Sequence, residues 1–536
     1  MMKKQILKIC VAAVLLVAML TGVCACTALQ TPEQTLKSAY KKNIDEFIDN
    51  LDSLYENTGG IDLSSMQNMT MELDIGVELS DVLLNLLNSA SETELSWEWL
   101  NDTTIHLSET TSGDKINMDI ALGFKDKQLI SANAIMDMAA GDIFLAIPLL
   151  TAKYLKISTE DMSDVTLPDM TQGADLSKIL PEQKVLEDLI YKYFDLIMQS
   201  VAEVEKVDAT ITAGGVSQKC SALEFTLTQR QVADLIINVL TEAKQDNDLK
   251  NIIYSAVEYI LSMQDDMQSL TMDVEAPYSA DEAYAEFVDG CNDAIESLNE
   301  SIADGEITDE TMVSISNFVN SKTDIIGIDA TFTADDESFH IFIGTAENDG
   351  NVGIQLFAED ISGKKLFEFV GKSTEVKDVL SGSYELLIDG ESMLFIDLEN
   401  MQTTKEGYAN GSITLSPSSG LIALIQDALG MDDAASVAGV ALSSMSLKFD
   451  LEQVDEKQIK TTIHVMSGRS DYIAITLDAT ISEAADVVIP TDFTESADDW
   501  AAEFDFNALL TQVQDSELPD FIVELVQLYV MMLQWS

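Results

Sequence analysis

The chain is 536 residues long, of which 46% are hydrophobic and 7% aromatic. This length exceeds one domain of ~100 to 200 residues, and this much apolar surface excludes a largely disordered chain. Three lysines and no acidic residue precede Cys26, so the remainder carries 26 basic and 93 acidic side chains and a net charge of −67. A charge of this size repels nucleic acid, which we therefore exclude as a partner.

The first 25 residues have the features of an export signal. Three lysines in the first eight positions precede an apolar run of twelve residues from Ile9 to Leu20. Signal peptides have apolar cores of ~7 to 15 residues, whereas a membrane-spanning helix needs ~20. We therefore predict a signal peptide over residues 1–25, with an uncleaved membrane anchor as the alternative.

The residues that end this signal, Val23-Cys24-Ala25-Cys26, resemble a bacterial lipobox, in which small residues precede the cysteine that is lipidated. Cys26 follows the small residue Ala25, whereas Cys24 follows Val23, so the resemblance selects Cys26 as the lipidation site. It implies a protein attached to the outer face of the cell membrane through its first mature residue. Two acyl chains, at ~0.8 kcal/mol per buried methylene, suffice for a stable anchor.

A helix is predicted directly after the anchor. Thr31 to Gln34 have the pattern of a capping box with proline at the first helical position. Apolar residues then recur at spacings of three and four up to Leu54, and Gly59-Gly60 ends the pattern. Three lysines near its start, Lys37, Lys41 and Lys42, either meet anionic head groups or lie on an ordinary solvated face.

Alternating apolar and polar residues from Met69 to Leu79 predict a strand with one wet face. The pattern recurs in residues 93–100 (TELSWEWL), 115–124, 128–138 and 142–148, which predicts an antiparallel meander. A short helical sequence, SDVLLNLLNS, interrupts this meander after its first strand.

Helical sequence follows from residue 180. One helix begins at Leu180-Pro181-Glu182, and a strand at residues 219–227 leads into a capping box at Thr228 to Gln231. Two further helices are predicted near residues 249–263 and 281–303, the latter capped by Ser279 and Glu282.

A second meander is predicted from Ile325 to Pro490. Its turn signals are Asn348-Asp349-Gly350, Asp389-Gly390 and Asn410-Gly411. The helical sequence SSGLIALIQDALG interrupts the second meander, as SDVLLNLLNS interrupts the first, and both meanders end on Ile-Pro. The two meanders could therefore have arisen by duplication of one segment followed by divergence. Two helices broken at Pro519 end the chain.

These elements together predict an α+β fold of two antiparallel β-meander sheets, curved or half-barrel-like, with packed helices. We expect a signal peptide at 1–25, a short tether and N-terminal helix at 26–64, a first sheet plus helical segment at 65–320, and a second sheet plus C-terminal helices at 321–536.

Phrases such as IPLLTAKYLKIS and TLTQRQVADLIINVLTEAKQDNDLK resemble uncharacterised lipoproteins of anaerobic Gram-positive bacteria. That likeness covers most of the chain and implies no known activity. The layout is remotely similar to the half-barrel lipoprotein carriers of the LolA and LppX type. This second resemblance implies a bent antiparallel sheet and helices that enclose an apolar cavity for lipid.

The sequence contains few candidates for catalysis. Its three histidines, His106, His340 and His464, lie in predicted strands at positions opposite their apolar neighbours, so we expect them on the wetter face. Metalloprotease, nucleophile-elbow and nucleotide-binding motifs are absent from the sequence. We therefore predict no catalytic residue, metal or cofactor, although a glycosidase-like acid pair stays possible because such pairs meet only in the fold.

Two cysteines follow Cys26 in the mature chain. Cys220 falls on the polar parity of its strand and Cys291 on the apolar stripe of its helix, and sequence leaves open whether they pair or stay free thiols. The 20 methionines after Cys26 either fill cores or line an adaptable binding surface. The final helix, residues 521–535, is apolar nearly all round, so we expect it in the core, with a cover over a hydrophobic cavity as the alternative.

The sequence therefore predicts an extracytoplasmic, membrane-anchored lipoprotein that is a non-enzymatic binding module for lipid or another apolar ligand. The alternatives are a surface hydrolase acting on glycan or cell wall, and an adhesion or scaffold protein. The membrane is the predicted partner, and no protein partner follows from the residues.

Overall fold

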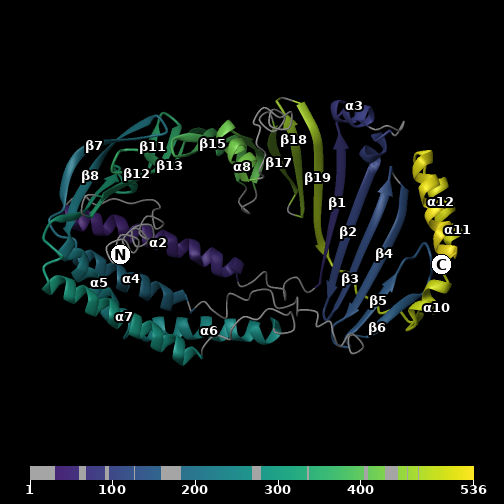
Figure 1. Ribbon diagram of the computed structural model, residues 1–536, viewed down its shortest axis with the longest axis horizontal. Coiled ribbons are helices and arrows are strands. Elements are labelled where there is room, and N and C mark those ends of the chain that lie inside the picture. Colours follow the sequence, from purple (N-terminus) through teal and green to yellow (C-terminus); the bar gives the residue numbers. More distant parts are fainter. Residues whose placement is uncertain are drawn as a thin grey trace. The chain divides into compact units, whose positions relative to one another are not determined.

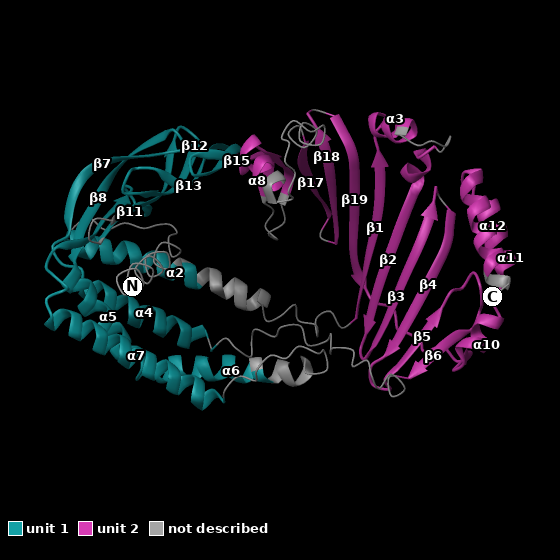
Figure 2. Ribbon diagram, viewed as in Figure 1, with its two compact units in different colours: residues 1–62, 167–375, 382–393 teal, residues 63–166, 376–381, 394–536 magenta. Residues whose placement is uncertain are grey.

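The structure is a computed structural model that describes residues 31–58, 68–90, 96–125, 127–158, 181, 183–267, 279–334, 337–403, 409–428, 445–455, 457–468 and 470–535. The chain divides into two compact units (Figure 2). Unit 1 comprises residues 1–62, 167–375 and 382–393, and unit 2 comprises residues 63–166, 376–381 and 394–536.

The described residues form helices in both units (Figure 1). The helices are α2 (Pro32–Thr58), α3 (Asp81–Ala90), α4 (Gln183–Gln199), α5 (Gln229–Ala243), α6 (Asn247–Met267), α7 (Ala280–Ala303), α8 (Ser419–Ala428), α10 (Ala497–Ala502), α11 (Phe506–Gln514) and α12 (Asp520–Trp535), with a 3₁₀ helix η1 (Glu98–Asp102).

The strands alternate with these helices along the chain. They are β1 (Met69–Leu79), β2 (Thr103–Ser112), β3 (Lys115–Phe124), β4 (Lys127–Asp137), β5 (Asp142–Ala146), β6 (Tyr154–Ser158), β7 (Glu205–Ala213), β8 (Val216–Thr228), β9 (Thr311–Val319), β10 (Ile325–Ala334), β11 (Glu337–Asn348), β12 (Asn351–Asp360), β13 (Lys365–Val376), β14 (Val379–Ile388), β15 (Glu391–Thr403), β16 (Ala409–Pro417), β17 (Met445–Asp455), β18 (Gln458–Ser467), β19 (Ser470–Glu483) and β20 (Phe493–Thr494).

Within the described residues these strands are hydrogen-bonded into one sheet of twenty strands. The pairing is antiparallel except where β20 joins β6 in parallel. The α+β class predicted from the sequence is confirmed. The two separate sheets that we expected are not found among the described residues.

Unit 1 buries one face of its strands under helices. Strands β7 to β13 follow one another as antiparallel neighbours, and α2 and α5 contact them. The core includes Leu223 of β8 and Ala330 of β10, both 0% exposed, and Phe332, 1% exposed. Leu36 of α2 and Val232 of α5 belong to the same core, so these helices cover the sheet.

A second, smaller core lies where the strands of unit 1 curve back on themselves. Ile211 and Ala213 of β7 pack against Phe342 of β11. A Cβ on Gly353 of β12 would stand 1.9 Å from the carbonyl oxygen of Ala213. Only glycine therefore permits the β7–β8 hairpin to approach β12 this closely.

Local sequence signals explain where the helices of unit 1 begin. Thr31 and Gln34 exchange hydrogen bonds at 3.2 and 3.3 Å, which confirms the predicted capping box of α2. The predicted boxes at Thr228 and Ser279 are also present, at the starts of α5 and α7. Each box satisfies two backbone groups that a helix end leaves unpaired.

Unit 2 contains an antiparallel run of strands in the order β16-β17-β18-β19-β1-β2-β3-β4-β5-β6. Strand β1 lies at its centre and pairs with β19, about 400 residues later in the chain, and with β2. Strands from both predicted meanders thus contribute to one unit.

The C-terminal helices pack on one end of this run of strands. Phe124 and Leu129 form a core with Val513 of α11 and with the inner side of α12. The outer side of α12 is exposed, with Leu525 at 62% and Tyr529 at 58%. The prediction that the whole final helix lies in the core is therefore wrong, because only one of its faces finds a partner.

Two local predictions are also wrong. The last three residues of TELSWEWL, 98–100, belong to η1, and the strand begins at Thr103, because Trp99 packs against the core under the C-terminal helices. The Asn410-Gly411 pair lies inside β16 and makes no turn. Gly411 has φ +125° and a Cβ there would stand 2.6 Å from the carbonyl oxygen of Asn400, so the glycine serves a close approach beside a bulge.

Candidate functional site

The register of unit 2 places apolar side chains on one face of neighbouring strands. Ile105 of β2 lies opposite Ile75 of β1 and Leu122 of β3, and Ile75 lies opposite Leu477 of β19. Residues directly opposite each other in an antiparallel pair share a face. We call the resulting surface the apolar face; it consists of Met71, Leu73, Ile75, Val77, Ile105, Leu107, Met118, Ile120, Leu122, Ile473, Ile475, Leu477, Ile463, Val465, Leu447 and Phe449.

Much of the apolar face is open to solvent. Met71 is 44% exposed, Ile105 38%, Met118 42%, Ile120 51% and Leu122 37%. Ile105, Ile120 and Leu122 are neighbours on β2 and β3, whereas Met71 and Met118 lie on either side of the exposed Glu109 of β2. Exposed aliphatic residues on soluble proteins are normally scattered singly. This group of exposed apolar side chains is therefore the candidate binding surface of unit 2.

The opposite face of the same strands is polar. Asp74 of β1 pairs with His106 of β2, whose Nδ1 lies 2.7 Å from Asp74 Oδ1, and both side chains are exposed. On β3 and β4, Asn133 donates to Asn117 and Asp119 at 2.6 and 2.8 Å. The alternation predicted from the sequence is therefore confirmed, including the wet position of His106.

His464 belongs to a second group on this polar face. Its Nε2 lies 3.0 Å from Asp450 Oδ2, and the ammonium of Lys448 lies 2.9 Å from Asp450 Oδ1. Burial opposes ionisation of Asp450, but hydrogen bonds from Ser412 and Lys448 and the positive charge of Lys448 outweigh it and lower the pKa of this carboxyl. The serine bonds directly to the carboxylate, so this group lacks the serine–histidine contact of a catalytic triad.

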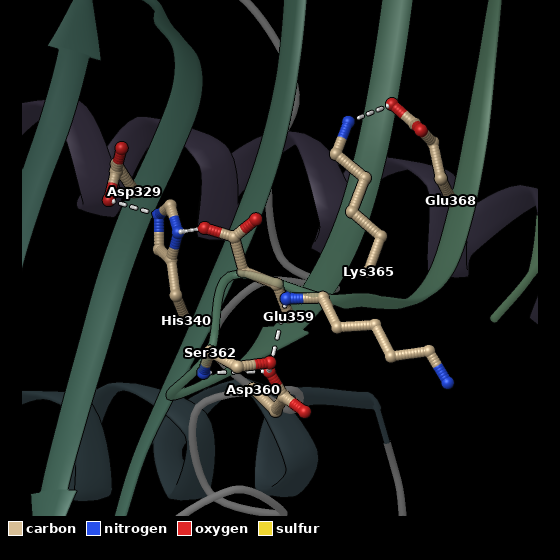
Figure 3. A network of polar contacts seen from close by, with 8 residues as sticks. Asp329, His340, Glu359, Asp360, Ser362, Lys365 and Glu368 are labelled. Carbon is tan, nitrogen blue, oxygen red and sulfur yellow. Dashed lines mark hydrogen bonds and ion pairs between the residues drawn. The ribbon is translucent and has the colours of Figure 1, made fainter. Parts of the chain in front are cut away.

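The third histidine, His340 of β11, bridges two carboxylates (Figure 3). Its Nε2 lies 2.8 Å from Asp329 Oδ1 of β10, and its Nδ1 lies 2.6 Å from Glu359 Oε1 of β12. Burial alone would lower the pKa of His340, but the hydrogen bonds and charges of Glu359 and Asp329 outweigh it and raise the pKa. The imidazole ring thus links three consecutive strands of unit 1.

His340 lies on the wetter face of β11, as predicted, because its neighbours Phe339 and Ile341 belong to the main core on the opposite face. Its ring meets Phe357 edge-on with 5.2 Å between centroids, and its side chain is 24% exposed. Both ring nitrogens are already engaged by carboxylates, so the network supports a structural role better than proton transfer to a substrate.

Cys220 and Cys291 are free thiols. Cys291 of α7 is 4% exposed, as its place on the apolar stripe predicts, and burial raises the pKa of its thiol. Cys220 packs against the smaller core of unit 1 although it lies on the polar parity of β8. Burial also raises the pKa of the Cys220 thiol, which lowers its reactivity.

The lysines near the start of α2 have carboxylate partners. Lys42 lies 2.7 Å from Asp324 with only 15% of its side chain exposed, so it points into the protein. Lys37 pairs with Asp195 at 2.6 Å. These contacts favour an ordinary helix face over contact with anionic head groups. Cys26 and the preceding signal lie outside the described residues.

The methionines of the described residues include a buried group and an exposed group. Met312 and Met393 are buried at 7% and 6% exposure, whereas Met71 and Met118 lie on the exposed apolar face. Sequence composition alone could not separate these two groups, because the difference depends on which strand lies alongside.

Neither a metal centre nor a membrane span emerges from the part of the chain that the structure describes. No set of three histidine, cysteine or acidic side chains there is placed to hold a metal ion. None of the helices described is both long enough and apolar enough to cross a bilayer. The chain matches no protein-family description, and no curated protein has a detectably similar sequence.

Proposed function

We propose that the protein is an extracytoplasmic lipoprotein, attached to the membrane through Cys26, and that the apolar face of unit 2 binds a lipid or another apolar molecule. The observation that carries this proposal is the exposure of Met71, Ile105, Met118, Ile120 and Leu122 on one face of three neighbouring strands. Because burying exposed apolar area contributes roughly 25 cal/mol per Å², several such side chains give a ligand a substantial gain in binding free energy.

The finer architecture enters the same proposal. We propose that the strands of unit 2 form a curved, half-barrel-like sheet with the apolar face on its inside. A bent sheet would surround an acyl chain on more than one side, and the flexible side chains of Met71 and Met118 would adapt to different chains.

The electrostatic properties of the chain favour a neutral or weakly cationic ligand. The formal net charge is −64 at pH 7, so an anionic ligand would approach against the field of the whole protein. The carboxylate of Glu109 lies among the five exposed residues that carry the proposal, and their own side chains fit the hydrocarbon part of a lipid.

The binding test compares two lysine substitutions on one strand. Ile120→Lys places a charge on the apolar face, and Ala121→Lys places the same charge on the polar face of β3. We expect wild-type protein and Ala121→Lys to bind the neutral dye Nile red, and Ile120→Lys to bind it at least roughly tenfold more weakly. Native mass spectrometry of protein expressed from Thr27 should show a bound apolar molecule. Equal dye binding by the two variants, or none by the wild type, would contradict the proposal.

The anchor has its own test. Metabolic labelling with an alkyne fatty acid should mark the wild-type chain and leave Cys26→Ala unlabelled, while Cys24→Ala keeps the label. Persistent label in Cys26→Ala would refute the lipidation site without bearing on the apolar face.

A further inference from the structure

Helices α3 and α8 occupy equivalent positions in unit 2. Helix α3 connects β1 to β2, and α8 connects β16 to β17, and in both cases the two strands pair in antiparallel fashion. In unit 1 the chain likewise leaves β8 into α5 and returns to pair with β8 through β9. The connection in unit 1 is longer, because it contains α5, α6 and α7 where the described part of unit 2 has α3 or α8.

The orientation of α3 and α8 is set in the same way. The hydroxyls of Ser80 and Ser418 each accept a hydrogen bond from an amide in the first turn, at 3.3 and 3.0 Å. Four residues after each serine comes a buried aliphatic side chain, Leu84 at 5% and Ile422 at 6% exposure. The cap and the buried residue together fix which side of each helix meets the protein.

The other side of each helix carries aliphatic residues that are exposed. On α3, Val82 is 54% and Leu86 62% exposed; on α8, Leu424 is 52% and Ile425 42% exposed. In α5 of unit 1 the outcome is different, because Ile236 packs against the main core. An aliphatic residue of α5 is therefore packed against a core, whereas these four aliphatic residues of α3 and α8 are exposed.

Both helices lie at the same end of the strands of unit 2. Four antiparallel pairings separate β16 from β1, so the two strands run in the same direction, and each helix follows directly after its strand. Four strand spacings of ~4.8 Å place the two strands roughly 19 Å apart along the sheet. The apolar face begins next to α3, because Val77 of β1 precedes it by four residues.

The charge of the two helices indicates what they contact. Each ten-residue helix has a single charged residue, Asp81 in α3 and Asp427 in α8, whereas 23% of the whole chain is charged. The exposed side chains are aliphatic and include none of the tryptophan, tyrosine or arginine residues that dominate protein interfaces. Aliphatic, nearly uncharged helix faces suit the surface of a neutral bilayer, and the acidic remainder of the protein disfavours an anionic one.

We infer that α3 and α8 dock unit 2 on an electrically neutral lipid bilayer. Lipid then passes between the bilayer and the apolar face at the end of the sheet where these two helices lie. This inference rests on the proposed function. Two weak contacts on one rigid sheet reinforce each other, because once one helix has inserted the second meets the same surface at high effective concentration.

The test is flotation of the chain expressed from Thr27 with phosphatidylcholine vesicles, so that no lipid anchor contributes. One variant carries Val82→Gln and Leu86→Gln, a second carries Leu424→Gln and Ile425→Gln, and a third combines all four. Glutamine keeps helix propensity, and all four positions are exposed, so folding is retained. The matched control carries Leu525→Gln and Leu528→Gln on α12, which are 62% and 56% exposed.

We expect wild-type protein and the α12 control to float with the vesicles, each pair on α3 or α8 to weaken binding roughly tenfold, and the fourfold variant to stay at the bottom. Replacing a third of the lipid by phosphatidylglycerol should weaken wild-type binding at low salt. Flotation of the fourfold variant, equal loss in the α12 control, or failure of wild-type protein to bind would overturn the inference. Nile red binding without vesicles separates the two proposals, since the fourfold variant should keep it and Ile120→Lys should lose it.

Discussion

The two units use the same kind of antiparallel strand but treat its apolar side chains in opposite ways. In unit 1, α2 and α5 cover the strands, and Leu223, Ala330 and Phe332 are at most 1% exposed. In unit 2, Met118 and Ile120 of β3 are 42% and 51% exposed. Both units contain alternating strands, so the packing of helices, and not the alternation, decides whether an apolar face is buried or exposed.

Core truncation should give the largest difference between the units. Phe332→Ala removes a side chain from the core of unit 1, and we expect it to lower the free energy of unfolding by roughly 3–5 kcal/mol. Ile120→Ala removes an exposed side chain in unit 2 and should change it by roughly 0.5 kcal/mol or less. Urea unfolding of both variants measures the contrast. An equal loss of unfolding free energy in the two variants would mean that Ile120 lies in a core. It would contradict the distinction between the covered strands of unit 1 and the exposed apolar face of unit 2.

Glycine substitutions probe the close packing of unit 1. Gly353→Ala would bring a methyl group within 1.9 Å of the carbonyl oxygen of Ala213, so the β7–β8 hairpin must move, at a cost of roughly 1–3 kcal/mol. Gly76 in β1 of unit 2 has no atom within 4 Å of its Cβ position, and Gly76→Ala should be neutral or slightly stabilising. Unfolding midpoints in urea measure both effects. A neutral Gly353→Ala would show that the hairpin does not lie on β12.

The pH dependence of His340 should give a smaller effect, confined to unit 1. Because Glu359 and Asp329 raise the pKa of His340, its charged form stabilises the folded state. This contribution is complete below the ordinary value of 6.5 and is lost as the pH rises through the raised pKa of the folded state. We expect His340→Gln to cost roughly 1 kcal/mol in mildly acidic solution and less in alkaline solution.

Urea unfolding across this pH range, together with NMR titration of the His340 ring protons, shows whether the stabilisation by His340 decreases as the pH rises. His106 is the matched control, because its single partner Asp74 and its side chain are both exposed. A difference between wild-type protein and His340→Gln that grows with pH would contradict the account of this bridge.

Local features of the fold were predictable from the sequence, and long-range ones were not. The capping boxes at Thr31, Thr228 and Ser279 and the alternation of β1 depend on residues a few positions apart, and all are confirmed. The pairing of β1 with β19 joins segments about 400 residues apart, and alternation contains no information about a strand's partner.

The candidate site shows the same limit. Alternation predicted which residues of β1 and β3 share a face, but it could not show that several of them are exposed, because exposure depends on where the helices pack. For the same reason the bridge of His340 to Asp329 and Glu359 was missed, since it requires the register of three strands. The sequence predicted α3 and α8 as short apolar helices that interrupt the strands. That both helices lie at the same end of the strands follows only from the strand order.

Methionine oxidation tests the central claim most directly. In ligand-free protein, hydrogen peroxide should oxidise Met71 and Met118 on the apolar face and Met531 and Met532 on α12, while Met312 stays intact at 7% exposure. Adding a short-chain phosphatidylcholine below its critical micelle concentration should protect Met71 and Met118 and leave the two α12 methionines reactive, as mass spectrometry of the peptides would show. Unchanged oxidation of Met71 and Met118 at saturating lipid would contradict the claim that the uncovered face of unit 2 binds lipid.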